Sequence, residues 1–377
     1  MKITDVTVIL AREWRTFLFV IIDTDEGIYG VGESGITGRE LAIAGAIEHF
    51  KPLLIGEDPF RTEHIWQRLF RVGFYPAQKI LTAAIAAIDI ALWDIKGKAT
   101  GLPVYQLLGG QVRDKVASYN HVHGSSTEEI IERIQEAIND GWKFTRLELP
   151  HEKDNSIEPR TAVVKCIEQF EAIRGAVGDK IEICYDIHTR LSPPDALWFC
   201  KEAEQYRPYF IEDPLRSEYT QAYRNLRSQT SVPLAFGEQY SSKWDFRQAI
   251  EEDLFDYARI DVCICGGLTE AKKIAGWCET HYIDIVVHNP IGPVATAACL
   301  HLNLSLPNFG VQETPHRPGE SMPDVVTGLP EWKDGYLLPP DKPGLGFEFD
   351  REAIKKYPYT QPDRPELHRV DGSFTNW

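Results

Sequence analysis

Acidic residues and histidines recur at nearly even intervals in the second half of this chain. Each follows a short apolar run typical of a buried strand, such as the IEICY that precedes Asp186. Successive members are 23 to 27 residues apart, a spacing that suits one strand-plus-helix unit each. The six residues are Asp186, Glu212, Glu238, Asp261, His288 and Glu313. These side chains can hold a metal ion and move protons, so they are the first candidates for chemistry.

Three of the six are carboxylates on consecutive predicted strands. Asp186, Glu212 and Glu238 each offer a hard oxygen donor, which Mg²⁺ prefers, whereas zinc prefers histidine and cysteine. We therefore expect one Mg²⁺ per subunit. In the run IEDP, Glu212 and Asp213 must face opposite ways, and spacing alone does not say which of them points inward.

The next two predicted strands end in an acid and a histidine. A buried Asp261 beside His288 would fix the tautomer of the imidazole and raise its basicity, which is the arrangement of a general base. The alternative is a structural Asp–His hydrogen bond.

A second acid–histidine pair stands in the stretch CYDIHTR, which contains Asp186 and His188. Side chains two positions apart on a strand point to the same face, so we expect these two to lie side by side. They could be a structural pair, two metal ligands, or one metal ligand and one proton carrier.

The elements that must position these residues are short apolar runs alternating with amphipathic segments from about Ser118 onward. Eight such runs, mostly with helical patterns between them, predict parallel strand–helix units closed into a TIM-like barrel. The alternative is an open doubly wound sheet, but no Gly-x-Gly-x-x-Gly follows a first strand. In a barrel the carboxyl ends of the strands meet at one mouth, where the candidates would gather.

The chain divides into three predicted regions. Residues 1–115 mix strand and helix patterns, and residues 116–330 carry the barrel pattern. Residues 331–377 are rich in Gly and Pro, do not continue the strand–helix rhythm, and are expected to pack back on the N-terminal region.

Composition narrows the classes of partner. The 377 residues carry a net charge of −16, which argues against nucleic acid and anionic membrane surfaces. A small anionic substrate then needs a bound cation. No apolar run is long enough to span a bilayer, the start lacks a signal peptide's apolar core, and the seven cysteines contain no Cys-x-x-Cys pair. We expect a cytoplasmic protein with reduced thiols.

Several ordered motifs resemble one known family. YDIH, FIEDP, AFGEQ, RID followed by VVHNPIGPVATAA, VQET and the earlier AAIDIALWDIKGKATGLPVYQLLGG are similar to the mandelate racemase subgroup of the enolase superfamily. The resemblance covers essentially the whole chain. It implies a (β/α)7β barrel and an α+β capping domain built from both termini. It also implies Mg²⁺ held by Asp186, Glu212 and Glu238, an Asp261–His288 base, and Glu313 bonded to the substrate carboxylate. Relatives are commonly homo-oligomers.

Within the subgroup, YDIHTRLSP resembles mannonate dehydratases and HNPIGPVATAACLHL resembles galactonate dehydratases. The resemblance implies a lyase that dehydrates an aldonate such as D-galactonate, D-mannonate or D-gluconate. His288 would remove the C2 proton, His188 would protonate the departing C3 hydroxyl, and the product would be a 2-keto-3-deoxy acid. The alternatives are a racemase or epimerase of an α-hydroxy acid on the same fold, or a non-catalytic sugar-acid-binding relative.

The sequence departs from many relatives on the second barrel strand. Arg146-Leu147-Glu148 replaces Lys-x-Lys, which disfavours cycloisomerases and dipeptide epimerases that use those lysines, and also racemisation, which needs a base on each face of the carbanion. Further candidates for substrate contact are Arg146, His121, His123, Tyr75 and His316. His121-Val122-His123 could instead be part of the zinc site of an amidohydrolase. Such a site needs further histidine ligands on later strands, where this sequence has carboxylates.

Overall fold

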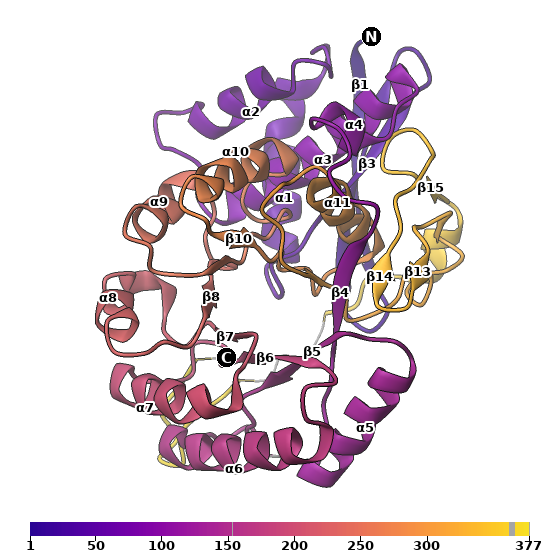
Figure 1. Ribbon diagram of the computed structural model, residues 1–377. Helices are drawn as coiled ribbons and strands as arrows, with labels where there is room; N and C mark the ends of the chain where they lie inside the picture. Colours follow the sequence, from indigo (N-terminus) through magenta and orange to yellow (C-terminus); the bar gives the residue numbers. More distant parts are fainter. Residues whose placement is uncertain (153, 362–365, 377) are drawn as a thin grey trace.

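The computed structural model, which describes residues 1–152, 154–361 and 366–376, is built around a closed barrel of parallel strands (Figure 1). Eight strands pair in parallel, in chain order, within a ten-stranded sheet. They are β4 (Val116–His121), β5 (Phe144–Glu148), β6 (Glu182–Asp186), β7 (Phe210–Glu212), β8 (Leu234–Phe236), β9 (Tyr257–Ala258), β10 (Asp284–Ile285) and β11 (Gln312–Glu313). The last strand pairs with the first, and a parallel bridge between Ile285 and Phe309 completes the circle.

A helix follows each of the first seven barrel strands and lies on the outside (Figure 1). These are α5 (Thr127–Asn139), α6 (Pro159–Val177), α7 (Pro193–Ala203), α8 (Ala222–Arg227), α9 (Lys243–Glu251), α10 (Leu268–Glu279) and α11 (Pro293–Leu304). Three of them begin with proline, whose fixed φ suits the first helical turn and whose missing N–H has no partner there. The predicted (β/α)7β barrel is confirmed.

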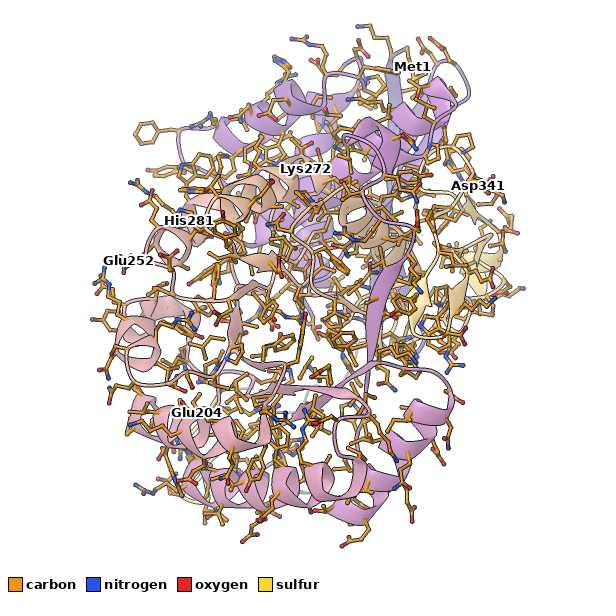
Figure 2. All side chains as sticks on the ribbon, in the orientation of Figure 1. Met1, Glu204, Glu252, Lys272, His281 and Asp341 are labelled. Atoms are coloured by element: carbon orange, nitrogen blue, oxygen red, sulfur yellow. The ribbon has the colours of Figure 1, made fainter. Side chains whose placement is uncertain are left out.

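Side chains fill the space that the strands enclose (Figure 2). An apolar cluster lies inside the barrel, with members from six of its strands and from the segment just before β11. Its members are Tyr119, Cys184, Phe210, Ala235, Val286 and Val311, with Ala117, Phe144, Tyr209 and Tyr257 packed against it. The barrel is therefore a solid core with a floor on which polar residues can stand.

The N-terminal region has the expected mix of strands and helices. It contains an antiparallel sheet of β1 (Ile3–Arg12), β2 (Thr16–Thr24) and β3 (Tyr29–Ser34), followed by α1 (Glu40–Leu54), α2 (Thr62–Arg71), α3 (Ile80–Thr100) and α4 (Val104–Leu107). A Cβ on Gly32 would lie 1.8 Å from the carbonyl oxygen of Ala87, so only glycine lets β3 lie directly on the Ala-rich helix α3.

The C-terminal tail returns to this sheet, as predicted. Phe349 stacks edge-on against Phe19 at 5.2 Å between ring centroids, and Arg351 pairs with Asp23 at 2.6 Å. The tail contains β13 (Trp332–Lys333), β14 (Tyr336–Leu337), β15 (Glu348–Phe349) and a 3-10 turn at Ala353–Lys356, and β15 pairs with β12 (Val326–Thr327), which lies just before the tail.

The tail also makes two contacts that the sequence did not predict. β14 pairs antiparallel with barrel strand β4, so this part of residues 331–377 extends the barrel sheet. Near the end of the chain, Asn376 donates to the carbonyl of Thr189 and accepts from Arg216, both in loops at the barrel mouth. None of the described helices is long and apolar enough to cross a bilayer.

One buried carboxylate joins the N-terminal and C-terminal parts of the capping layer. Asp94 on α3 accepts hydrogen bonds from the backbone N–H of Val31 (3.0 Å) and of Leu345 (2.9 Å), and pairs with Lys98 at 2.7 Å. Its side chain is 1% exposed. Asp94 therefore connects the N-terminal sheet to the C-terminal tail through hydrogen bonds to one side chain.

We predict that Asp94→Ala lowers the free energy of unfolding by about 3 kcal/mol, because it leaves two buried N–H groups and an ammonium without their partner. Urea denaturation followed by circular dichroism measures this change. Glu48→Ala, on the exposed face of α1, is the control and should change the free energy by less than about 0.5 kcal/mol. Equal losses in the two variants would contradict the role given to Asp94.

Candidate active site at the carboxyl ends of the barrel strands

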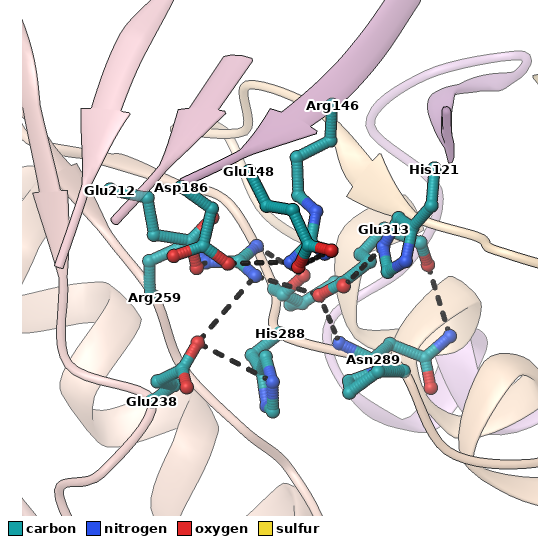
Figure 3. A network of polar contacts seen from close by, with 12 residues as sticks. His121, Arg146, Glu148, Asp186, Glu212, Glu238, Arg259, His288, Asn289 and Glu313 are labelled. Atoms are coloured by element: carbon teal, nitrogen blue, oxygen red, sulfur yellow. Dashed lines mark hydrogen bonds and ion pairs between the residues drawn. The ribbon is translucent and has the colours of Figure 1, made fainter. Parts of the chain in front are cut away.

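Strand alternation explains how most of the candidates reach the mouth. Side chains two residues apart share a face, so the residue two positions after an apolar floor residue also points inward, one level higher. This step leads from Cys184 to Asp186 and from Phe210 to Glu212. The same two-residue step leads from Tyr119 to His121, from Val286 to His288 and from Val311 to Glu313. Figure 3 shows their side chains converging.

The three predicted metal ligands lie on neighbouring strands. Asp186 and Glu212 are paired residues of β6 and β7, and both are fully buried. Glu238 is 15% exposed and lies just beyond β8, where Gly237 with φ of 129° redirects the chain. The simple two-residue alternation therefore does not extend to Glu238; the turn at Gly237 brings it to the mouth.

The charges of this group are poorly neutralised. Burial raises the pKa of Glu238 to about 7; His288 opposes the shift, while Asp213 and Asp186 add to it. Burial also raises the pKa of Glu212, against the effect of Arg259 and with that of the neighbouring acids. The second carboxylate oxygen of Glu212 is buried without a hydrogen-bond partner. These carboxylates therefore have fewer positive partners than their burial requires.

Whether Mg²⁺ fits depends on the donors and on their present partners. Three carboxylates and an unpartnered buried oxygen are the donor chemistry that Mg²⁺ prefers. Within the described part of the chain, however, no three acidic, histidine or cysteine side chains are already gathered around one point. At Asp186, the oxygen that could bind an ion already has other partners, because Oδ2 lies 2.5 Å from Arg146 and 2.9 Å from His188. The donor set fits the ion, and an ion bound there competes with Arg146 for Asp186.

Arg259 is a site residue that the sequence reasoning missed. It is fully buried, donates to Glu212 Oε1 and, at 2.7 Å, to Glu313 Oε2, and lies 4.0 Å from Glu238 Oε2 (Figure 3). The available signal was its place two residues before Asp261 in the run RID, although both residues lie beyond the end of β9 at Ala258. Arg259 cross-links the carboxylates of three strands.

The predicted acid–histidine pair is present at the ends of β9 and β10. His288 Nδ1 lies 2.8 Å from Asp261 Oδ2, and the other oxygen of Asp261 accepts the backbone N–H of Cys263 at 2.7 Å. The opposite ring nitrogen, Nε2, lies 3.4 Å from Glu238. Burial alone would lower the pKa of His288, but Glu238, Glu313 and Asp261 outweigh it and raise the pKa to about 9.

Asp186 and His188 are side by side, but the reason we expected was wrong. β6 ends at Asp186, and His188 has φ of 51°, so it lies in the left-handed region and not on an extended strand. This turn lets the His188 backbone N–H donate to Asp186 Oδ1 at 2.8 Å while its ring contacts Oδ2. His188 Nδ1 also lies 3.5 Å from Glu148.

The two histidines stand on opposite walls of the barrel. His188 follows β6 and His288 follows β10, and three strands separate β6 from β10 in either direction around the eight-stranded circle. Groups so placed can act on two different sides of a molecule held between them.

The remaining candidates divide into inner and outer positions. His121 bonds Glu313 at 2.7 Å, and burial together with Arg146 lowers its pKa to about 4. His123 bonds Glu148 at 3.1 Å, and its side chain is 52% exposed, at the edge. Tyr75 is 79% exposed on the loop between α2 and α3. The ring of His316 packs at a tilt against that of Trp14, with 4.5 Å between the centroids, beside a small cavity that Asn289 also lines.

Glu313 is held by three donors. His121 Nε2 (2.7 Å), Arg259 Nη2 (2.7 Å) and the backbone N–H of Asn289 (2.8 Å) surround its two oxygens. Although burial opposes ionisation, Arg259, His288 and His121 hold the pKa of Glu313 well below its usual range. An ionised Glu313 accepts hydrogen bonds and cannot donate one to a carboxylate.

Comparison with known proteins agrees with this geometry. The family model described as the mandelate racemase / muconate lactonizing enzyme N-terminal domain matches residues 5–109, and the one described as enolase C-terminal domain-like matches residues 129–353. The chain belongs to the enolase superfamily. With this membership, the zinc amidohydrolase alternative falls away.

Named relatives of this enolase superfamily member span its full length. A D-galactonate dehydratase of Pectobacterium atrosepticum is 39% identical over 389 residues, and a D-mannonate dehydratase of Caulobacter vibrioides is 36% identical over 406 residues; each match covers 100% of both chains. Among solved structures, an enolase from Pantoea ananatis with bound D-gluconate and Mg has a TM-score of 0.93 and 32% identity, over 100% of this chain and 99% of that one.

We predict that Glu212→Gln does not destabilise the metal-free protein, because it removes a buried charge that lacks a full partner. Its melting temperature should equal or exceed that of the wild type in EDTA, while Mg²⁺ should raise only the wild-type value. Differential scanning fluorimetry gives both values.

The matched control is Glu270→Gln. Glu270 is also fully buried, but Lys243 pairs with both of its oxygens at 2.8 and 3.0 Å. This variant should lose about 3 kcal/mol, with or without Mg²⁺. A similar loss in Glu212→Gln would show that Glu212 is a structural ion-pair partner and not an incomplete metal site.

Proposed function

We propose that this protein is a Mg²⁺-dependent sugar-acid dehydratase, which removes water from an aldonate to give a 2-keto-3-deoxy acid. The observation that carries the proposal is the pair of histidines on opposite walls, each beside a carboxylate, together with three further acids, Glu212, Glu238 and Glu313, at the same mouth. The names of the two full-length relatives and the D-gluconate in a solved relative support the substrate class.

His288 is proposed as the base that removes the C2 proton. Asp261 accepts the hydrogen on Nδ1 and thereby keeps Nε2 as the basic atom, which faces the metal-ligand side near Glu238. Glu238 makes the largest carboxylate contribution to the raised pKa of His288. When Glu238 is neutralised, that pKa falls and the neutral imidazole that a base requires becomes more populated.

Asp186, Glu212 and Glu238 are proposed to hold the ion. When bound there, Mg²⁺ would stabilise the negative charge that develops on the substrate carboxylate as the C2 proton leaves. It would also make the mouth of a protein with a net charge of −16 attractive to a sugar acid.

His188 is proposed as the acid that protonates the C3 hydroxyl as it leaves. Asp186 lies 2.9 Å from its Nε2 and Glu148 lies 3.5 Å from its Nδ1, so two carboxylates hold the ring in place at the mouth. If Asp186 held the ion, Arg146 would lose that partner while keeping Glu148 at 3.5 Å, and its guanidinium could then bond a substrate oxygen.

The other residues predicted to contact the substrate remain proposals, and they differ in how close they lie to the centre of the mouth. His121 and Glu313 face the mouth, and Glu313 is better placed to orient Arg259 and His121 than to bond a substrate carboxylate directly. His123, Tyr75 and His316 lie at the edge and would contact only the far end of a longer substrate. The cytoplasmic location and the homo-oligomer also stay predictions; the seven buried free cysteines suit the former.

We predict that His288→Asn abolishes exchange of the C2 proton with solvent deuterium, because it removes the only base proposed for that proton. His188→Asn should reduce dehydration by at least about 100-fold yet retain exchange, because proton removal precedes loss of the hydroxyl. NMR in D₂O follows both events in one sample.

The control for these variants is His281→Asn. His281 bonds Asp253 at 2.8 Å just after α10, on the outside of the barrel, and this substitution should leave turnover unchanged. Undiminished exchange in His288→Asn would refute the base assignment.

We also predict that the purified protein with Mg²⁺ converts at least one of D-galactonate, D-mannonate and D-gluconate to a keto acid that semicarbazide detects. EDTA should abolish the reaction, and added Mg²⁺ should restore it. A racemase would give inverted hydroxy acid and no keto acid, and a non-catalytic relative would give neither.

A further inference from the structure

Two buried carboxylates of the capping layer reach across to helices of the barrel. Glu33, at the end of β3, accepts the backbone N–H of Ala295 at 2.8 Å. Asp89, on α3, accepts the backbone N–H of Thr269 at 2.9 Å and its hydroxyl at 2.5 Å. Ala295 and Thr269 lie in the first turns of α11 and α10, so each acid satisfies a helix N-terminus that belongs to the other domain.

The two helix starts are built to receive these acids. Both have glycine as the N-cap residue, Gly292 and Gly267, and neither glycine can supply a cap of its own. A Cβ on Gly292 would lie 2.1 Å from Glu33 Oε1, and a Cβ on Gly267 would lie 2.4 Å from Asp89 Oδ2. Each glycine therefore leaves the space that a carboxyl group from the capping layer occupies, and an oxygen of that group accepts a hydrogen bond from the first turn of the helix.

The loops clamped in this way are the ones that carry the Asp261–His288 pair. Asp261 lies in the loop that leads from β9 to Gly267, and His288 lies in the loop that leads from β10 to Gly292. Further bonds from the same layer hold both loops, because Trp66 donates to the carbonyl of Gly266 at 2.8 Å and Arg15 donates to that of Pro290. α3 packs against α10 and β3 against α11 (Figure 1).

We propose that Glu33 and Asp89 are positioning residues for the general base. They fix the loops after β9 and β10, and so hold Asp261 and His288 at hydrogen-bonding distance with Nε2 of His288 facing the substrate. The capping layer then sets the geometry of proton abstraction as well as covering the mouth. This inference rests on the proposed function, because it assigns a purpose to the pair that the dehydratase mechanism uses.

The test uses Glu33→Ala and Asp89→Ala in the full-length enzyme. Each should lower kcat about 10- to 100-fold, since a small displacement of a catalytic group is that costly, with KM for the sugar acid nearly unchanged. C2 proton exchange should fall in parallel, and the Mg²⁺ dissociation constant should not change. Glu33→Gln, which keeps an oxygen to accept the N–H of Ala295, should recover most of kcat.

Asp94→Asn is the matched control. Asp94 lies on the same helix as Asp89, is equally buried, and also accepts backbone N–H groups, but from Val31 and Leu345. This variant should melt earlier and keep the wild-type kcat at temperatures where it is folded. The proposal is overturned if Glu33→Ala and Asp89→Ala also keep the wild-type kcat, or lose it only in proportion to their melting temperatures.

Hydrogen exchange measured by mass spectrometry separates this inference from the function on which it rests. The alanine variants should exchange faster over residues 262–270 and 288–296, whereas Asp94→Asn should not. Unchanged exchange in these segments refutes the positioning role whether or not a substrate is found. An inactive wild type in which the alanine variants show the faster exchange refutes the dehydratase proposal and leaves the clamp standing.

Discussion

Buried negative charge at one end of a closed barrel is the constraint on which the rest of this structure depends. Five carboxylates meet there, each at or just beyond the end of a different strand: Asp186, Glu212, Glu238, Asp261 and Glu313. Only two side chains at their centre are positively charged at any ordinary pH, Arg146 and Arg259. Desolvation and mutual repulsion would drive these acids apart or neutralise them, so their arrangement has to be maintained by partners and packing.

The partners explain most of the geometry of the mouth. Arg259 stands at the centre and bonds Glu212 and Glu313, while Arg146 occupies the Asp186 oxygen that an ion would use. Three histidines, His121, His188 and His288, each contact one or more of the acids. One oxygen of Glu212 still has no hydrogen-bond partner, and the pKa of Glu238 is raised. Both observations indicate negative charge that is not fully neutralised, and a divalent cation would neutralise it.

Two groups of contacts hold the acids in place against their mutual repulsion, one inside the barrel and one from the capping layer. Below, the apolar floor of the barrel fixes the strands on which the acids stand. From the side, the capping layer, itself joined to the C-terminal tail through Asp94, bonds the loops after β9 and β10. The acid–histidine pair at the ends of those strands is therefore supported by residues that are far away in the sequence, and a catalytic site needs such support because its charged groups do not stabilise their own positions.

The barrel, the strand ends at which the site lies and the types of residue there could be predicted along the chain. These depend on local periodicity, on the length of a strand–helix unit and on motifs that resemble one family. The pairing of the side chains, in contrast, follows from three-dimensional packing. The left-handed turn at His188, the redirection at Gly237, the central place of Arg259, the strand that the tail adds to β4, and the caps from Glu33 and Asp89 all depend on which distant backbones come close. The sequence does not show which distant residues come close in space. Each acid has many possible partners of opposite charge, and the packing of the fold determines which of them it contacts.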